Sequence, residues 1–571
     1  MPNGTIDSKL PGKGRRIWGV RMRLSNWRLW LIMTHRWTGI TIGLMFVIWT
    51  VSGLVLMYYG LPHLTAGERL SRLPPLDVSA IRISPAEAAA QIDGEASRLR
   101  VSMLDDRPVY RLNTGRGFGR WTLVYADTGE VFQGFDRDGA LAWLRGYVPD
   151  AAGQVTYDAY VSGPDLFTHN PGLPSHMPMH RLSLNDAAGT RYYVSEHSGE
   201  AVMKTDRIGR LLGFVGYELH TLFFFRQKTW WSVLLQALSW AGLVMTVLGI
   251  VLGIVRFALT PRFRRRGKAS RSPYSGLMKW HHYAGLMCGV FVFAWMFSGL
   301  VSLGVIPGIA ETPYTPQQIA VGARSLQGEG PRIDFERLSL ENLHRAAEAL
   351  ASAFPVKELE LIQFDGEPYY IAYREPTAEE RRDWTSRSAF DFITPTLDHE
   401  HRLVSAVRPE TGAFARFPDD AMLRAARHAM TGADIVGADW LDEFDDYYYD
   451  RLPSFDLGLP RAAITLPVLR VKFDDALGTW LYLTPTHGQL LKFEAVERAN
   501  RWAYYGLHGF DFAFLFRNRP LWDIVTIVLM LGVGVVGTTT LLPMMRRLKR
   551  HALKFATGLR GWLGRWSAAQ G

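Results

Sequence analysis

The feature that most constrains this chain is a long apolar stretch, residues 30–59, that carries a histidine near its start. About 20 apolar residues suffice for a helix to cross a bilayer, so the stretch predicts a membrane span. Gly39 and Gly43 follow His35 at i+4 and i+8, which places all three on one helix face. A histidine beside a track without side chains indicates a place where a flat, bulky group can lie against the helix.

The same stretch occurs twice, since residues 34–54 align without a gap with residues 280–300. The matched positions are His35 and His281, Gly39 and Gly285, Gly43 and Gly289, and Ser52 and Ser298. His282 is the neighbour of His281, but a leucine and a valine lie one and two turns below it instead of glycines. The repeat and the local helix face therefore both favour His281, with His282 as a spare candidate.

Length and apolarity predict four spans, at residues 30–59, 231–255, 280–306 and 521–545. The positive charge of the chain is concentrated in the segments beside them, at residues 1–29, 256–279 and 546–571. Basic segments mark the cytoplasmic side, so both termini are expected there, in a bacterial inner membrane. The long segments 60–229 and 307–520 are then expected in the periplasm. Every basic run adjoins a span, which favours topology over nucleic-acid binding as its explanation.

The duplication extends beyond the spans. Residues 177–202 and 466–491 share a strand-turn-strand pattern, and each is followed by a helical stretch that contains a Leu-His pair. His220 thereby corresponds to His508. The fold class predicted is an internally duplicated (2+2), all-α bundle of four transmembrane helices with two periplasmic α+β domains, one in each long segment. Each domain is expected to end in an interfacial helix before the next span.

The four histidines are expected at two depths. His35 lies about 36 Å from the other end of its span along a straight helix, which places it and His281 near the cytoplasmic face. Polar residues separate His220 and His508 from the spans that follow them, so this pair is expected at the outer face. Each pair then draws one histidine from each half of the chain.

Paired imidazoles in a membrane favour haem as the bound group. A lone histidine in a span more often bonds a neighbouring helix, but duplicated positions backed by glycines favour a functional site. Two imidazoles occupy both axial positions of a haem iron, which leaves none for oxygen and suits single-electron transfer. The only cysteine, Cys288, lies inside a span, so covalent haem attachment and thiolate clusters are excluded. Two b haems are therefore expected; a metal without porphyrin would need further ligands.

Three weaker patterns lie outside the four histidines, and two of them have two readings. His63, just outside the first span, is a spare ligand for the outer haem. The acidic and aromatic run at 439–451 would bind a cationic or metal-bearing substrate, or equally pack its aromatic rings on the domain. Arg517 and Arg519, near His508, would pair with haem propionates or anchor the chain at lipid headgroups.

The string GVGVVG at residues 532–537 matches the dinucleotide-binding fingerprint in letters only. It lies inside a span with no preceding strand, so its glycines are interpreted as sites of close helix or haem packing. No other stretch resembles a nicotinamide or flavin domain, and the electron donor is therefore expected to be a quinol or another protein.

The histidine motifs at 35–39 and 281–285, the two Leu-His pairs and the strand motifs resemble the PepSY-associated transmembrane helix family. Members include inner-membrane proteins that are similar to di-haem ferric-siderophore reductases of bacterial iron uptake. The resemblance implies PepSY-like periplasmic domains, haem b, and an oxidoreductase that reduces a ferric siderophore or other ferric complex. It implies the ligand role for His35, His220, His281 and His508.

Two other functions remain open from the sequence. The first is a haem-free membrane protein whose PepSY domains regulate or inhibit a periplasmic peptidase. The second is a transporter, which predicts polar, broken helices at the middle of the bilayer; the four spans carry almost no charge there.

Overall fold

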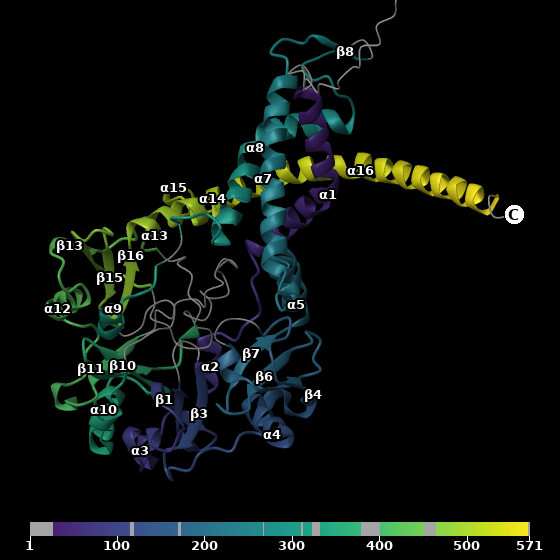
Figure 1. The fold of residues 1–571 in the computed structure, drawn as a ribbon. Helices are drawn as coiled ribbons and strands as arrows, with labels where there is room; N and C mark the ends of the chain where they lie inside the picture. Colours follow the sequence, from purple (N-terminus) through teal and green to yellow (C-terminus); the bar gives the residue numbers. More distant parts are fainter. Residues whose placement is uncertain are drawn as a thin grey trace, which may run out of the picture.

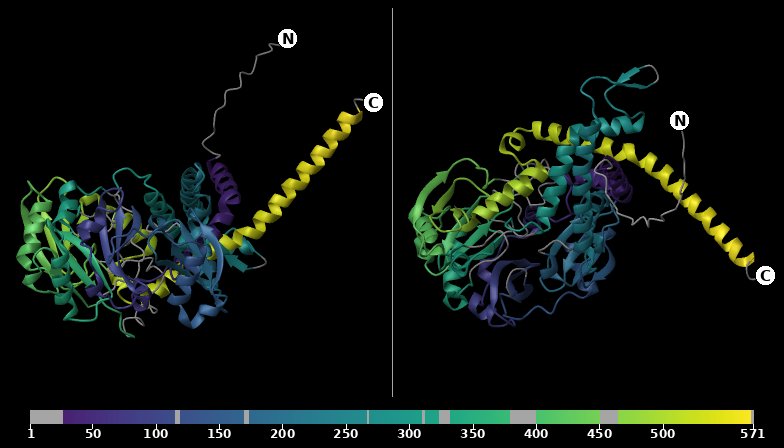
Figure 2. Two further views of the ribbon diagram at one scale, coloured as in Figure 1. Left: turned by 90° about the horizontal axis from the view of Figure 1, so that it is seen from below. Right: turned by 45° about the horizontal axis from the view of Figure 1, so that its top comes forward.

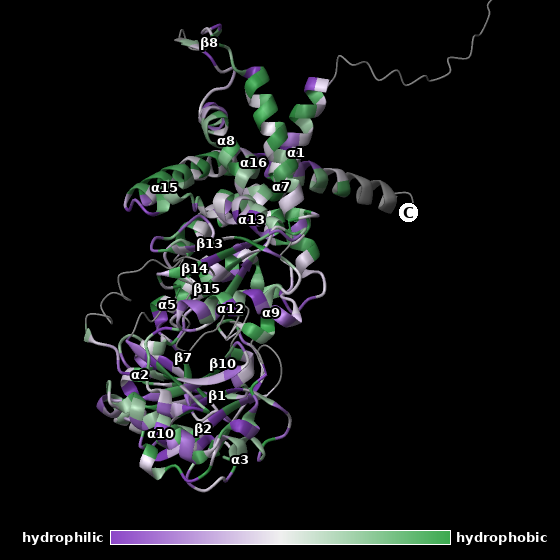
Figure 3. Cartoon of the chain, turned by 90° about the vertical axis from the view of Figure 1, so that its left-hand side faces the viewer, coloured by the Kyte–Doolittle hydropathy of each residue, from purple (hydrophilic) through white to green (hydrophobic). Residues whose placement is uncertain are grey.

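Four apolar helices form one end of the molecule and three main β-sheets form the other (Figure 1). The structure is a computed structural model that describes residues 27–114, 119–168, 173–265, 268–309, 312–322, 332–378, 400–449 and 464–568. The helices that are long and apolar enough to cross a membrane are α1 (Trp27–Leu56), α7 (Trp231–Arg256), α8 (Leu277–Ser302) and α16 (Leu521–Ala568). Colouring by hydropathy shows that apolar residues dominate this end (Figure 3). The chain is a multi-pass membrane protein.

The four helices contact one another in the cyclic order α1, α7, α8, α16. Glycines permit close approach where they cross. A Cβ built on Gly242 would lie 2.7 Å from the Met296 sulfur, and one on Gly532 only 2.5 Å from Cys288 Sγ. Gly532 belongs to the GVGVVG string, whose glycine is therefore a helix-packing residue, as the sequence indicated.

The last helix is longer than the sequence predicted. The expected span ended at residue 545, but α16 continues without a break to Ala568. Pro543 lies inside this helix, and the residues after it are mostly Arg, Lys, Leu and Ala, which favour helix. Figure 2 shows the C-terminal part of α16 leaving the bundle and extending away from the other helices.

The two long segments between the spans share one sheet. Its order is β12-β11-β10-β1-β2-β3, and the central pair, β1 and β10, is antiparallel with Leu99 opposite Leu361. The first segment contributes β1 (Ala96–Leu104), β2 (Arg107–Thr114) and β3 (Arg120–Tyr125). The second contributes β10 (Glu358–Phe364), β11 (Glu367–Tyr373) and β12 (His401–Ser405). The sequence predicted one separate domain per segment; the structure differs because β1 and β10 pair through their free edges.

Each segment also forms a four-stranded antiparallel sheet of its own. The first sheet comprises β4 (Thr156–Val161), β5 (Met179–Ser183), β6 (Arg191–Ser195) and β7 (Ala201–Thr205). The second comprises β13 (Ile435–Leu441), β14 (Val468–Phe473), β15 (Trp480–Thr484) and β16 (Gln489–Phe493). β5 to β7 and β14 to β16 coincide with the repeated strand-turn-strand patterns of the sequence.

Short helices cover the sheets and connect them to the bundle. Their bounds are α2 Ala66–Arg72, α3 Pro85–Ala89, α4 Arg137–Tyr147, α5 Arg207–Gly213, α6 Leu219–Thr221, α9 Pro316–Val321, α10 Leu340–Ala351, α12 Asp419–Ala429, α13 Ala495–Asn500, α14 Leu507–Gly509 and α15 Ala513–Phe516. Leu343 and Leu350 of α10 are fully buried in the core of the shared sheet. A small hairpin, β8 (Phe263–Arg265) and β9 (Lys268–Ser270), lies between α7 and α8.

A buried cluster of charges joins the two segments. Arg69 of α2 and Glu358 of β10 approach to 2.6 Å, and so do Arg100 of β1 and Glu200, the residue before β7; every side chain is at most 6 % exposed. Burial alone would raise the pKa of the Glu358 carboxyl, but Arg69 and Arg100 outweigh it and hold that pKa below its usual value. A lowered pKa means that this stabilisation is present above about pH 4.3 and is lost as the pH falls further.

We predict that Glu358→Gln lowers the free energy of unfolding by about 3–5 kcal/mol, because it leaves buried guanidinium groups without their counter-charge. The control is Glu367→Gln on the adjacent strand, which breaks the half-exposed pair between Arg337 and Glu367 and should change stability by about 1 kcal/mol or less. Denaturant titration of the purified full-length protein in detergent measures both. Equal losses from the two variants would contradict the role given to the cluster.

Candidate functional site: two histidine pairs in the bundle

The first pair, here called the inner pair, comprises His35 of α1 and His281 of α8. Their ring centroids are 6.2 Å apart and the ring planes are inclined by 42°. The Nδ1 atom of His35 lies 3.0 Å from the carbonyl oxygen of Met245 in α7, and that of His281 lies 3.1 Å from the carbonyl of Val536 in α16. A carbonyl only accepts, so each Nδ1 carries the proton and each Nε2 keeps a lone pair for a ligand. All four spans thus take part in this site.

The second pair, the outer pair, comprises His220 of α6 and His508 of α14, on the side of the bundle that adjoins the sheets. The ring centroids are 6.0 Å apart and the planes are inclined by 83°. Each Nδ1 is bonded to a serine of a span: Ser52 Oγ lies 3.1 Å from His220, and Ser298 Oγ lies 2.9 Å from His508. These bonds leave Nε2 as the nitrogen with which each ring can bind a ligand.

The chain reaches the outer pair by the same route in both halves. β7 leads into α5 and then a π-helical turn (Phe214–Glu218) before α6, while β16 leads into α13 and a π-helical turn (Arg501–Gly506) before α14. Residues of left-handed conformation end both short helices, Leu222 with φ 50° and Phe510 with φ 51°. Such turns occur often at functional sites, because they re-aim a side chain that a regular helix would direct elsewhere.

The spacing of both pairs fits one shared iron. An imidazole nitrogen binds a transition metal at about 2.0 Å, and it lies about 1.1 Å from the centre of its own ring. Two imidazoles on opposite sides of one metal therefore have ring centres about 6.2 Å apart. The observed values are 6.2 and 6.0 Å. Hydrogen bonding of the second ring nitrogen to the protein is also typical of histidines that bind metals.

The donor set favours haem over a bare metal ion. Among the described residues, no group of three or more His, Cys, Asp or Glu side chains is placed to hold a metal. Each pair therefore offers two protein ligands, and a porphyrin would supply the remaining ones. Haem in this position needs space beside the rings.

The glycines named from the sequence differ in their surroundings. A Cβ built on Gly285 would meet nothing within 4 Å, and Cβ atoms on Gly39 and Gly43 would make ordinary contacts at 3.5 and 3.9 Å. Gly289 instead packs against α7, where an added Cβ would lie 2.8 Å from Ile250. Gly249 of α7, which the sequence reasoning missed, lies next to the His35 ring. A Cβ built on Gly249 would be 2.8 Å from Cε1 of His35.

The two spare histidines are engaged in other bonds. His282 is buried, with Nδ1 2.8 Å from Ser272 Oγ and Nε2 2.9 Å from the carbonyl oxygen of Gly253. Both ring nitrogens of His282 thus bond within the protein. Of the two adjacent residues, His281 is therefore the ligand candidate. The Nδ1 of His63 lies 3.3 Å from the carbonyl of Leu61.

The acidic and aromatic run is packed against the chain that leads to α16; its last two residues lie outside the described part. Tyr448 and Tyr449 are fully buried, and Asp445 accepts hydrogen bonds from Arg470 and Tyr482. This geometry favours the packing interpretation over binding of a cation.

The two arginines near His508 bond to the protein. Arg517 donates to the carbonyl of Asp445 at 3.1 Å, and Arg519 forms an ion pair with Asp523 of α16. Both therefore have protein partners at the membrane-side end of the second segment.

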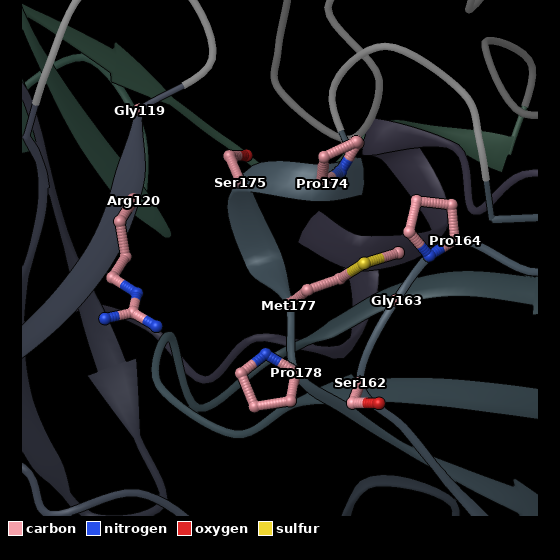
Figure 4. A pocket seen from close by; sticks show the side chains of 9 residues that line it. All are labelled: Gly119, Arg120, Ser162, Gly163, Pro164, Pro174, Ser175, Met177 and Pro178. Atoms are coloured by element: carbon pink, nitrogen blue, oxygen red, sulfur yellow. The ribbon is translucent and has the colours of Figure 1, made fainter. Parts of the chain in front are cut away.

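A cavity of about 450 Å³ lies in the sheet-bearing part of the molecule, near the start of β3 (Figure 4). It is lined by Gly119, Arg120, Ser162, Gly163, Pro164, Pro174, Ser175, Met177 and Pro178. This lining contains one cation and no imidazole or carboxylate, so the cavity offers no set of metal ligands.

Fold and site together define a multi-pass membrane protein with one histidine pair at each end of its helical bundle. The family model for the PepSY-associated TM region matches residues 32–568, and the chain belongs to this family. No curated protein matches the sequence.

If both pairs hold haem, we predict that His281→Ala removes about half of it from protein produced with ample haem supply, because one of the two candidate sites would lose a ligand. His282→Ala, the neighbouring control, should retain all of it, since both of its ring nitrogens bond within the protein. Haem per protein, measured from the pyridine haemochrome spectrum, distinguishes the two. The opposite pattern would contradict the assignment of the inner pair.

Proposed function

We propose that this protein carries single electrons across the bacterial inner membrane through two b haems and reduces a ferric complex, of the siderophore type, on the periplasmic side. The observation that carries this proposal is the spacing of the histidine pairs, 6.2 and 6.0 Å between ring centres, which suits two imidazoles on one iron. Haem iron cycles between ferric and ferrous states and so supplies one-electron chemistry.

The two histidine pairs lie at different levels along the helical bundle. Ser52, which bonds His220, lies about 26 Å along α1 from His35. The apolar core of a bilayer is about 30 Å thick, so the two pairs sit near its two faces. The two histidines of each pair would hold the haem and occupy the positions that oxygen could otherwise take, which would suit the site to electron transfer.

The basic segments beside the spans support the orientation, with both termini in the cytoplasm and the sheets in the periplasm. A quinol or a protein donor gives up one electron at the cytoplasmic side. One electron converts Fe(III) of the external complex to Fe(II). The lower charge of Fe(II) weakens its attraction to anionic oxygen ligands, so reduction promotes release of the iron.

The outer pair is the one that adjoins the sheets, and the two segments that form the sheets contain most of the extramembrane residues. We infer that an acceptor docks on this side, where the distance to the second haem is shortest. On this basis the protein is a membrane-bound oxidoreductase of the ferric reductase type.

We predict that purified protein shows the visible bands of bis-histidine haem b, and that a ferric siderophore re-oxidises the dithionite-reduced protein after the excess reductant is removed. Stopped-flow spectroscopy under nitrogen measures this step. His508→Ala, which removes a ligand of the outer pair, should slow it at least tenfold. A colourless protein from haem-replete cells would refute the proposal and leave peptidase regulation as the function to test.

A further inference from the structure

We propose that two Trp-x-x-Ser clamps, Trp49–Ser52 in α1 and Trp295–Ser298 in α8, position the histidines of the outer pair and set the reduction potential of the haem they hold. This inference rests on the function proposed above. The clamps themselves are side chains outside the ligand set, so they act through the histidines.

Three hydrogen bonds form each clamp. Ser52 Oγ donates to the carbonyl of Trp49 at 3.3 Å and lies 3.1 Å from Nδ1 of His220, while Trp49 Nε1 donates to the carbonyl of His220 at 2.8 Å. The indole thus holds the backbone of the histidine, and the hydroxyl holds its ring. Ser52 is only 1 % exposed, so water does not compete for these bonds.

The second half of the chain repeats the arrangement bond for bond. Ser298 Oγ donates to the carbonyl of Trp295 at 3.1 Å and lies 2.9 Å from Nδ1 of His508. Trp295 Nε1 donates to the carbonyl of His508 at 3.0 Å. Ser298 is fully buried. The two residues between them differ in the two halves, yet both halves have Trp and Ser three residues apart, at the positions that the bonds require.

The histidines lie at the C-terminal ends of the helical stretches that carry them. His220 lies two residues before the left-handed Leu222, and His508 lies two residues before Phe510 in the same conformation. The last carbonyls of a helix have no partner within the helix, and the indoles of the clamps donate to those of His220 and His508. The clamps supply restraint from α1 and α8, which are rigid spans.

The direction of the serine bond determines its chemical effect. The serine hydrogen is directed to the tryptophan carbonyl, so Oγ accepts from Nδ1–H and the lone pair of Nε2 is free for iron. A ligand histidine that donates its second N–H becomes more basic, which stabilises ferric iron and lowers the reduction potential. The inner pair uses backbone carbonyls of Met245 and Val536 for the same purpose. Only the outer pair is therefore under the control of a side chain.

The test is a potentiometric titration of the full-length protein, followed by the haem absorbance. Ser52→Ala and Ser298→Ala together should retain both haems and shift one component to higher potential, by at least tenfold in the reduction equilibrium, or about 59 mV for one electron. The other component should not move. The His281→Ala background, which keeps only the outer pair, assigns the moving component. Ser298→Thr keeps a hydroxyl and should restore most of the original potential.

Ser302→Ala is the matched control, because Ser302 lies one turn further along α8 and its hydroxyl bonds only the carbonyl of Gly299 in its own helix. It should leave both potentials unchanged. Unchanged potentials in the double serine variant, an equal shift of both components, or loss of the outer haem from a protein that remains folded would each overturn the clamp. Wild-type protein without haem would instead overturn the function on which the clamp rests.

Discussion

Each of the two ring nitrogens of a histidine inside an apolar bundle needs a bonding partner from the protein or a ligand, because water is excluded there. The arrangement of this protein follows from that requirement. At each of the four histidines, Nδ1 is bonded to the protein, by a carbonyl in the inner pair and by a serine in the outer pair. The second nitrogen of each ring then needs a partner. Rings whose centres are about 6 Å apart are too far for a direct bond and suitably spaced for a shared metal.

An iron shared between the halves of the chain, as proposed, would require the halves to keep a fixed register. The extramembrane part meets this demand with the pairing of β1 and β10 and with the buried charges around Glu358. A buried ion cluster contributes little net stability but imposes a large penalty on any arrangement that separates its members. Within the membrane, the helices approach closely at Gly242 and Gly532. Helices packed this closely have few alternative positions, which also restricts the register of the two halves.

The sequence was sufficient to predict the repeat, the four spans and which histidines lie together in pairs. Long apolar stretches and a gapless internal alignment leave few alternatives. The sequence did not reveal that the two segments share a sheet, because strand periodicity shows which residues face a core but not which edges pair. Gly249 and the carbonyls of Met245 and Val536 were missed for a related reason: they act through backbone position, which composition does not encode. The serine bonds could have been predicted, because Ser52 and Ser298 occupy matched positions of the aligned repeat. The sequence analysis identified this match but did not infer a role for the two serines.

The differences between the two pairs are as informative as their likeness. Duplication of one helix pair supplies each site with one histidine from each half of the chain, His35 with His281 and His220 with His508. Duplication alone cannot make the ends differ, because both halves contribute to both pairs. The difference instead comes from where the histidines lie. Those of the inner pair belong to the spans α1 and α8 and meet backbone carbonyls of α7 and α16. Those of the outer pair belong to α6 and α14 and meet a serine and an indole of a span. The two halves of the chain match each other at each end, so the asymmetry lies between the two ends of the bundle and not between the halves.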